Sequence, residues 1–149
     1  MRDLLFILLI LSISISCTRE DEAPVFPASP VISMVQVQPT QVIAYQDSIS
    51  FQIAYEDGDG DLGENTAGSE NLFLKDTRTG ASYTFRIRRL VPDDTEVPVK
   101  GTLSFVLPFA ILTDESSTSQ QAVFEIRVKD RAGNESNVIS TEAITIMRE

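Results

Sequence analysis

The chain has 149 residues, and its content of 42% hydrophobic and 23% charged residues is typical of a globular protein. It contains no His and one Cys, so His-dependent catalytic triads, zinc sites with His ligands and intramolecular disulfides are excluded. The formal net charge is −10, and residues 20–74 hold ten acids without a single Lys or Arg. That part of the protein therefore disfavours nucleic acid and anionic lipid as partners and favours cations or basic partners, unless the charge serves solubility alone.

The first residues indicate a secretion signal. Arg2 precedes an unbroken apolar run over residues 4–11, and small residues then lead to Cys17, a pattern too short for a membrane-spanning helix. The residues before Cys17 resemble a bacterial lipobox, with Ser14 in place of the usual Leu. We therefore expect a cleaved lipoprotein signal peptide over residues 1–16 and acylation of Cys17, which anchors the mature protein in a membrane. The alternative is that Cys17 marks only the edge of a cleaved leader.

Residues 17–30 form the predicted link between this anchor and the domain. The acids at positions 20–22 resemble the export signal that sends Bacteroidota lipoproteins to the outer face of the outer membrane. That resemblance implies a lipid-anchored outer-membrane protein that faces the cell surface. The prolines among residues 23–30 exclude a helix or a central strand and predict a semi-extended tether.

Residues 31–149 show the alternation of apolar and polar residues that predicts β-strands. The alternation is clearest over residues 48–55, where four large apolar side chains face one way. Seven such runs are predicted, over residues 31–37, 48–55, 72–75, 83–88, 102–107, 124–129 and 138–147. Short strands separated by turns, with no long amphipathic helix, predict an all-β fold: an antiparallel seven-stranded immunoglobulin-like β-sandwich.

Three smaller expectations concern the runs and their connections. Val35 and Val37 are expected on the same face of the first strand. Residues 109–121 are expected to form a long connection with an apolar start that packs and a polar end that is mobile. A group of three arginines forms either a basic contact stripe or, as we favour, a solvated strand face that blocks edge pairing: Arg86, Arg88 and Arg89.

The most unusual stretch is the acidic loop, residues 57–63, in which Asp57, Asp59 and Asp61 alternate with glycines directly after the second predicted strand. Glycines permit tight turns, so successive carboxylates can converge instead of splaying apart. Ca²⁺ prefers such clusters of oxygen ligands. The stretch is not an EF-hand loop, because Leu62 stands where that loop needs Gly and Gly68 where it needs Glu. The sequence therefore predicts a possible Ca²⁺ site.

A second polar loop, residues 130–137, follows the sixth predicted strand. In an immunoglobulin-like domain, the loops after the second and sixth strands lie at the same end of the sandwich. Asp130 and Asn134 are therefore candidate additional ligands for the ion. Two alternatives stay open: the acidic loop is a hydrated turn whose aspartates cap backbone amides, and residues 130–134 form an ordinary Asx-type turn.

Three features coincide in this chain: the lipobox-like leader with acids behind Cys17, the acidic loop followed by Asn71, and the loop over residues 130–137. Together they resemble a widespread group of small Bacteroidota surface lipoproteins with one immunoglobulin-like or fibronectin-III-like domain. The resemblance implies a surface location and a fold class, but no activity.

The function that we expect is a non-enzymatic binding or accessory module, anchored to the membrane through lipid, with Ca²⁺ as the possible cofactor and an unknown protein or glycan as partner. Glycosidase chemistry would require an acid with a raised pKa in an apolar cleft, whereas these aspartates stand on a glycine-rich loop. The alternative is a purely structural envelope lipoprotein or spacer that stabilises a partner complex without metal.

Overall fold

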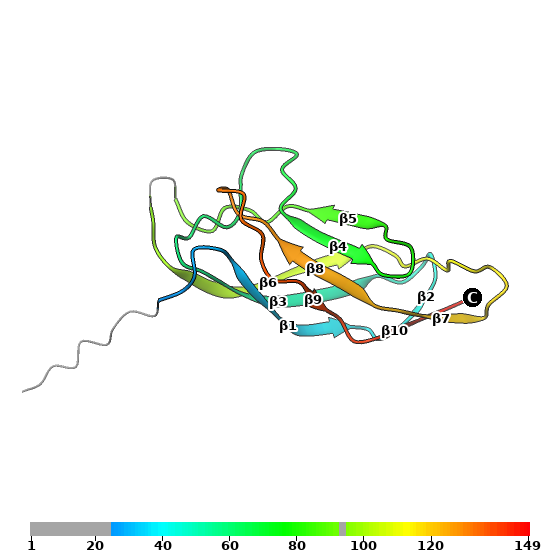
Figure 1. Ribbon diagram of the computed structural model, residues 1–149. Helices are drawn as coiled ribbons and strands as arrows, with labels where there is room; N and C mark the ends of the chain where they lie inside the picture. Colours follow the sequence, from blue (N-terminus) through cyan, green and yellow to red (C-terminus); the bar gives the residue numbers. More distant parts are fainter. Residues whose placement is uncertain (1–24, 93–94) are drawn as a thin grey trace, which may run out of the picture.

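The computed structural model describes residues 25–92 and 95–149 of the chain (Figure 1). The expected signal peptide, Cys17 and the first part of the tether lie outside the described residues. No helix in the part of the chain that the structure describes is long and apolar enough to cross a membrane.

The described chain is all-β, as predicted, with its strands arranged in three sheets. The strands are β1 (Val31–Gln38), β2 (Gln41–Ile43), β3 (Ile49–Asp57), β4 (Leu72–Asp76), β5 (Ser82–Phe85), β6 (Val99–Leu107), β7 (Ser119–Ala122), β8 (Phe124–Val128), β9 (Ile139–Ser140) and β10 (Ile144–Met147). Sheet orders are β1-β3-β6, β5-β4-β8-β9 and β2-β10-β7. All pairs are antiparallel except β2 with β10.

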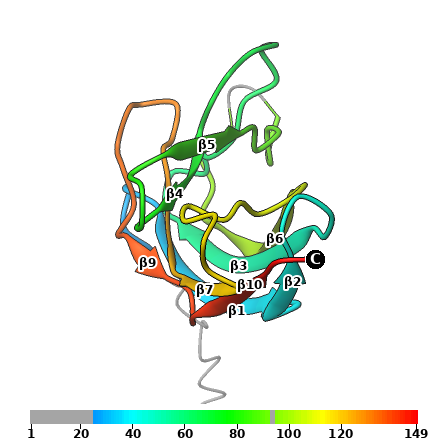
Figure 2. The same cartoon turned by 90° about the vertical axis from the view of Figure 1, so that its right-hand side faces the viewer.

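The first two sheets pack face to face and enclose the core. Phe51 of β3 stacks on Phe105 of the neighbouring β6, with 5.0 Å between ring centroids, and meets Phe124 of β8 edge-on at 5.8 Å. Phe85 of β5 closes over Phe105 from the opposite layer, at 4.9 Å. Figure 2 shows the two layers end-on, with β4 and β5 above β3 and β6. The apolar face predicted for residues 48–55 therefore lies in the middle of a sandwich.

The strand count differs from the seven predicted runs, because the structure contains ten strands. β2 was not expected, and the last predicted run is divided into β9 and β10 in different sheets. The end of the expected long connection, residues 119–121, belongs to β7 and pairs with β10. The apolar start of that connection packs as expected, since Ala110 and Leu112 are buried. The alternation in β2 and β7 spans too few residues to be detected above background.

The expectation that Val35 and Val37 share a face is wrong. The pairing of β1 with β3 shifts between Met34 and Gln36, so Val35 is the extra residue of a β-bulge. Val35 is 50% exposed, whereas Val37 is buried. A bulge moves one side chain out of the period-two pattern, and the sequence carries no local signal for it.

Two asparagine side chains act as substitutes for strand pairing. The Asn137 amide accepts a hydrogen bond from the Ile32 N–H and donates one to the Ile32 carbonyl, both at 2.8 Å. Asn71 does the same for the backbone of Ile87, accepting at 2.6 Å and donating at 3.1 Å. Each side chain therefore satisfies one residue of backbone where no neighbouring strand is available.

Candidate metal centre

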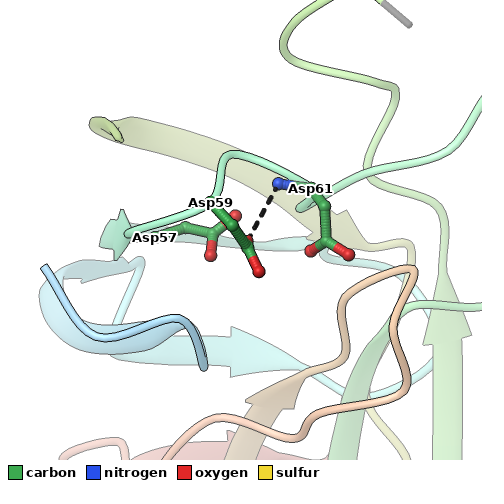
Figure 3. A group of neighbouring side chains, drawn as sticks. All are labelled: Asp57, Asp59 and Asp61. Atoms are coloured by element: carbon green, nitrogen blue, oxygen red, sulfur yellow. Dashed lines mark hydrogen bonds between the residues drawn. The ribbon is translucent and has the colours of Figure 1, made fainter. Parts of the chain in front are cut away.

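The acidic loop begins at the end of β3, where Asp57 takes the inward-facing position that follows Ile53 and Tyr55 in the alternation. The chain then turns, and it brings the carboxylates of Asp59 and Asp61 beside that of Asp57 (Figure 3). One oxygen from each of the three lies within 4.8 Å of the others. Two oxygens that bind one Ca²⁺ from opposite sides stand about 4.6–5.2 Å apart, so a single ion can contact all three.

Gly60 is required for this convergence. Its φ is +73°, and a Cβ atom at this position would lie 2.3 Å from the carbonyl oxygen of Val97. Both the backbone conformation and the close approach exclude other residues without a shift of the chain. The glycine between Asp59 and Asp61 is therefore a requirement of the turn itself.

The carboxylate of Asp57 is buried and half satisfied. Its residue is 0% exposed, and its Oδ2 accepts a hydrogen bond from the Leu62 N–H at 2.8 Å. Its Oδ1 is buried without a hydrogen-bond donor among the described residues. A buried carboxylate oxygen without a donor is costly, which makes this atom the strongest indication that the cluster takes up a cation or a proton.

Asp61 shows the same arrangement at the other side of the cluster. Its Oδ2 accepts from the Ala132 N–H at 2.9 Å, and its Oδ1 is buried without a donor within the described part of the chain. Asp59 contributes a longer contact, accepting from the Asp61 N–H at 3.4 Å. Neither of the two orphaned oxygens is satisfied by the described part of the protein.

The electrostatics follow from burial and mutual repulsion. Burial, followed by the negative charges of Asp59 and Asp61, raises the pKa of Asp57 to about 6. Burial also raises the pKa of Asp61, with Asp130 and Asp59 adding to the effect. Without a cation, Asp57 takes up a proton as the pH falls toward 6. A divalent ion would replace that proton and neutralise more of the charge.

The acidic loop and the loop over residues 130–137 are in contact, as the immunoglobulin-like arrangement predicted. The backbone of Asp61 accepts from the Arg131 N–H at 3.4 Å, in addition to the bond from Ala132. The guanidinium of Arg131 donates to the Gly63 carbonyl at 2.9 Å. These bonds join β3 and β8 at one end of the sandwich.

Asp130 and Asn134 form the Asx-type turn that was one of the two sequence interpretations. The Asp130 carboxylate accepts from the Asn134 backbone N–H at 2.7 Å and from its side-chain amide at 2.9 Å. Asp130 is not part of the group of three carboxylates that lies within 4.8 Å. Its negative charge nevertheless raises the pKa of Asp61, so it lies close enough to add to the field at the cluster.

An open cavity of about 550 Å³ lies beside the cluster and gives it access to solvent. Its lining consists of Asp59, Asp61, Thr95, Glu96, Arg131 and Ala132. This lining contains no aromatic or large apolar side chain, so it is not the apolar cleft that glycosidase chemistry requires.

Two polar features outside the candidate site also involve arginine. Arg86 and Arg88 are exposed, as the solvated face predicted, but they follow the end of β5 at Phe85, so the expectation that they lie on a strand is wrong. Arg86 donates to the Thr66 carbonyl at 3.1 Å. Asp76 is 1% exposed and forms a two-pronged ion pair with Arg78, at 2.6 and 3.0 Å. The Asp-x-Arg spacing was the available signal for this pair.

Comparison with known proteins does not assign a family. No protein-family model and no curated protein sequence matches the chain. Two solved structures are similar, the SrpA adhesin from Streptococcus sanguinis and a point mutant of it. The adhesin is 17% identical with a TM-score of 0.35, and the mutant is 19% identical with a TM-score of 0.34. The alignments cover 84% and 83% of this chain and 60% and 59% of those chains, and at this level of similarity they support no functional argument.

Proposed function

We propose that this protein is a non-enzymatic, calcium-binding β-sandwich module of a lipoprotein that is anchored through Cys17 at the cell surface. The observation that carries the calcium site is the fully buried Asp57, which presents an oxygen without a donor to two further carboxylates within 4.8 Å. Hard oxygen ligands in a cluster suit Ca²⁺, and external calcium at millimolar concentration fills sites with a Kd of about 10⁻⁴–10⁻³ M.

The role of the ion in this proposal is structural. The acidic loop follows β3 of one layer and is bonded to the loop that follows β8 of the other layer. An ion held by Asp57, Asp59 and Asp61 fixes the two layers at this end, beside the second loop, whose Asp130 and Asn134 side chains are bonded to each other. The proposed immunoglobulin-like arrangement fits this role, since the orders β1-β3-β6 and β5-β4-β8-β9 place the first six predicted runs and the start of the seventh in two layers.

The alternative is a spacer lipoprotein without metal, and one observation favours it. The pKa of Asp57, which burial raises to about 6, allows the cluster to lose part of its charge by binding a proton as the pH falls toward 6. In that case the cluster is a polar element of the fold, and the partner is another envelope protein.

Calorimetric titration with Ca²⁺ tests the proposal, using the chain from Thr18 onward, which lacks the acyl anchor. We expect heat of binding and a higher Tm at millimolar Ca²⁺ for the parent protein, and neither for Asp59→Asn. Glu142→Gln is the matched control, because it removes the same charge at an exposed position. If the parent shows no heat and no change in Tm, the calcium site does not exist and the spacer role is favoured.

A further inference from the structure

The first described residues of the chain pack against the acidic loop. The Gly58 N–H donates to the Pro27 carbonyl at 2.8 Å, and a Cβ atom on Gly58 would lie 2.3 Å from the Phe26 carbonyl oxygen. Figure 1 shows these residues, in blue, at the same end of the sandwich as the segment that follows β3. The chain therefore enters the domain at the metal centre.

This entry point determines which end of the domain is nearest to a lipid anchor at Cys17. Residues 17–24 reach at most about 30 Å when fully extended, at roughly 3.6 Å per residue. The nine residues of β3 place the opposite end of the sandwich about 30 Å farther away, at roughly 3.4 Å per residue. The acidic loop is therefore the membrane-proximal end of an anchored domain, a step that rests on the proposed function.

Without a cation, this end of the domain and an anionic membrane repel each other. Three carboxylates occupy only part of the six to eight positions that Ca²⁺ fills with oxygen, however. Asp59 and Asp61 line the open cavity, so the remaining positions of an ion bound to them face outward. The guanidinium of Arg131, fixed by its bond to Gly63, lines the same cavity and is a suitable partner for phosphate.

We propose that a Ca²⁺ ion held by Asp57, Asp59 and Asp61 also binds phosphate oxygens of lipid headgroups, and that it thereby holds this end of the anchored domain against the membrane. The ion reverses the electrostatic interaction, from repulsion between two negative surfaces to a bridge between them. Calcium then controls whether the domain lies on the membrane or extends away from it on its tether.

The composition of the chain allows this proposal to be tested directly. Cys17 is the only cysteine, so it can be coupled to maleimide lipids in vesicles as a substitute for the acyl anchor. The chain has no Trp, so one introduced Trp reports energy transfer to dansyl lipids. Val97→Trp places the donor beside Gly60, and Phe109→Trp places it just beyond Leu107, at the far end of β6. Both positions are exposed, by 40% and 49%.

On phosphatidylglycerol vesicles, we expect Ca²⁺ to increase energy transfer from the Val97→Trp protein and not from the Phe109→Trp protein. Asp59→Asn should abolish the increase while leaving the circular dichroism spectrum unchanged, and Glu142→Gln should retain it. Because coupling between two ligands is reciprocal, the vesicles should also raise the apparent Ca²⁺ affinity by at least about fivefold over that in solution.

Several results would overturn this inference. Heat of Ca²⁺ binding in solution without a change in energy transfer on vesicles refutes membrane contact and leaves the calcium site intact. An equal increase on neutral galactolipid vesicles, which carry sugar hydroxyls but no phosphate, refutes phosphate as the ligand and indicates a glycan. An equal response from Phe109→Trp refutes the orientation. Absence of binding heat refutes both the calcium site and the membrane contact that depends on it.

Discussion

Replacing Asp57 with Asn should stabilise the protein in the absence of calcium and remove its response to calcium. An Asn side chain keeps an oxygen for the Leu62 N–H, and it places an amide donor where Asp57 has the oxygen without a partner. The change removes one negative charge from a buried position next to Asp59 and Asp61, which otherwise repel it. Its cost in packing is small because the two side chains have nearly the same shape.

The magnitude follows from the pKa of Asp57, which burial raises from 3.8 to about 6. A raised pKa means that the folded protein binds the proton more tightly than the unfolded chain does. The free energy of unfolding is therefore highest below pH 3.8 with respect to this group, and it falls as the pH rises from 3.8 to 6. This difference in proton affinity corresponds to at most about 3 kcal/mol lost above pH 6, and Asp57→Asn should recover a part of that amount in EDTA at about pH 7.5.

Calcium should remove most of this difference in stability. At a concentration about 100-fold above its Kd, Ca²⁺ adds about 2.7 kcal/mol to the parent protein, whereas the variant should gain almost nothing. Urea unfolding followed by circular dichroism, at pH 5 and 7.5 with EDTA or Ca²⁺, measures both effects, and Glu142→Gln should behave as the parent in all four conditions. The reasoning is refuted if Asp57→Asn is less stable than the parent in EDTA at pH 7.5.

Three further predictions concern the surrounding structure. Asp76→Asn should lower the free energy of unfolding by about 3 kcal/mol, because Arg78 is left largely buried without its charged partner. Lys75→Gln breaks an exposed ion pair and should lower it by less than about 1 kcal/mol. Urea unfolding measures both changes, and equal costs would contradict the argument. Asn137→Ala should lower the free energy of unfolding by about 2 kcal/mol and accelerate hydrogen exchange at the Ile32 amide, because it removes the two hydrogen bonds between Asn137 and the backbone of Ile32. Unchanged exchange would show that these two bonds are unimportant. Gly60→Ala should lower Tm more than Gly68→Ala, since both have positive φ but only Gly60 approaches a carbonyl; equal effects would count against the close approach.

The parts of the fold that were predictable from the sequence are those governed by a repeating pattern. The long alternation of β3 and the shorter one of β8 identified strands that face the core, because a half-buried strand must alternate. The contact between Asp61 and Ala132 was also predictable, since it follows from the order of strands in a sandwich. The convergence of the three aspartates was predictable because the glycines between them allow the chain to turn.

The parts that could not be predicted depend on single long-range contacts. The bulge at Val35 is a property of the pairing with β3, and no local sequence rule specifies it. The burial of Asp76 depends on Arg78 reaching the Ile111 carbonyl, 33 residues along the chain, at 3.1 Å. The packing of Pro27 against Gly58 was missed because a proline-rich segment indicates an extended conformation but not the surface against which it lies.

The two hydrogen bonds between Asn137 and the backbone of Ile32 have a consequence for how the chain folds during synthesis. Ile32 and Asn137 are 105 positions apart. On the side of β1 that faces away from β3, the backbone of Ile32 forms no other hydrogen bond with the described residues. A growing or truncated chain that lacks residue 137 therefore presents an open strand edge near its N-terminus. Completion of this edge of β1 depends on a residue 105 positions later, so fragments that end before Asn137 should associate through β1 in a way that a chain with Asn137 does not.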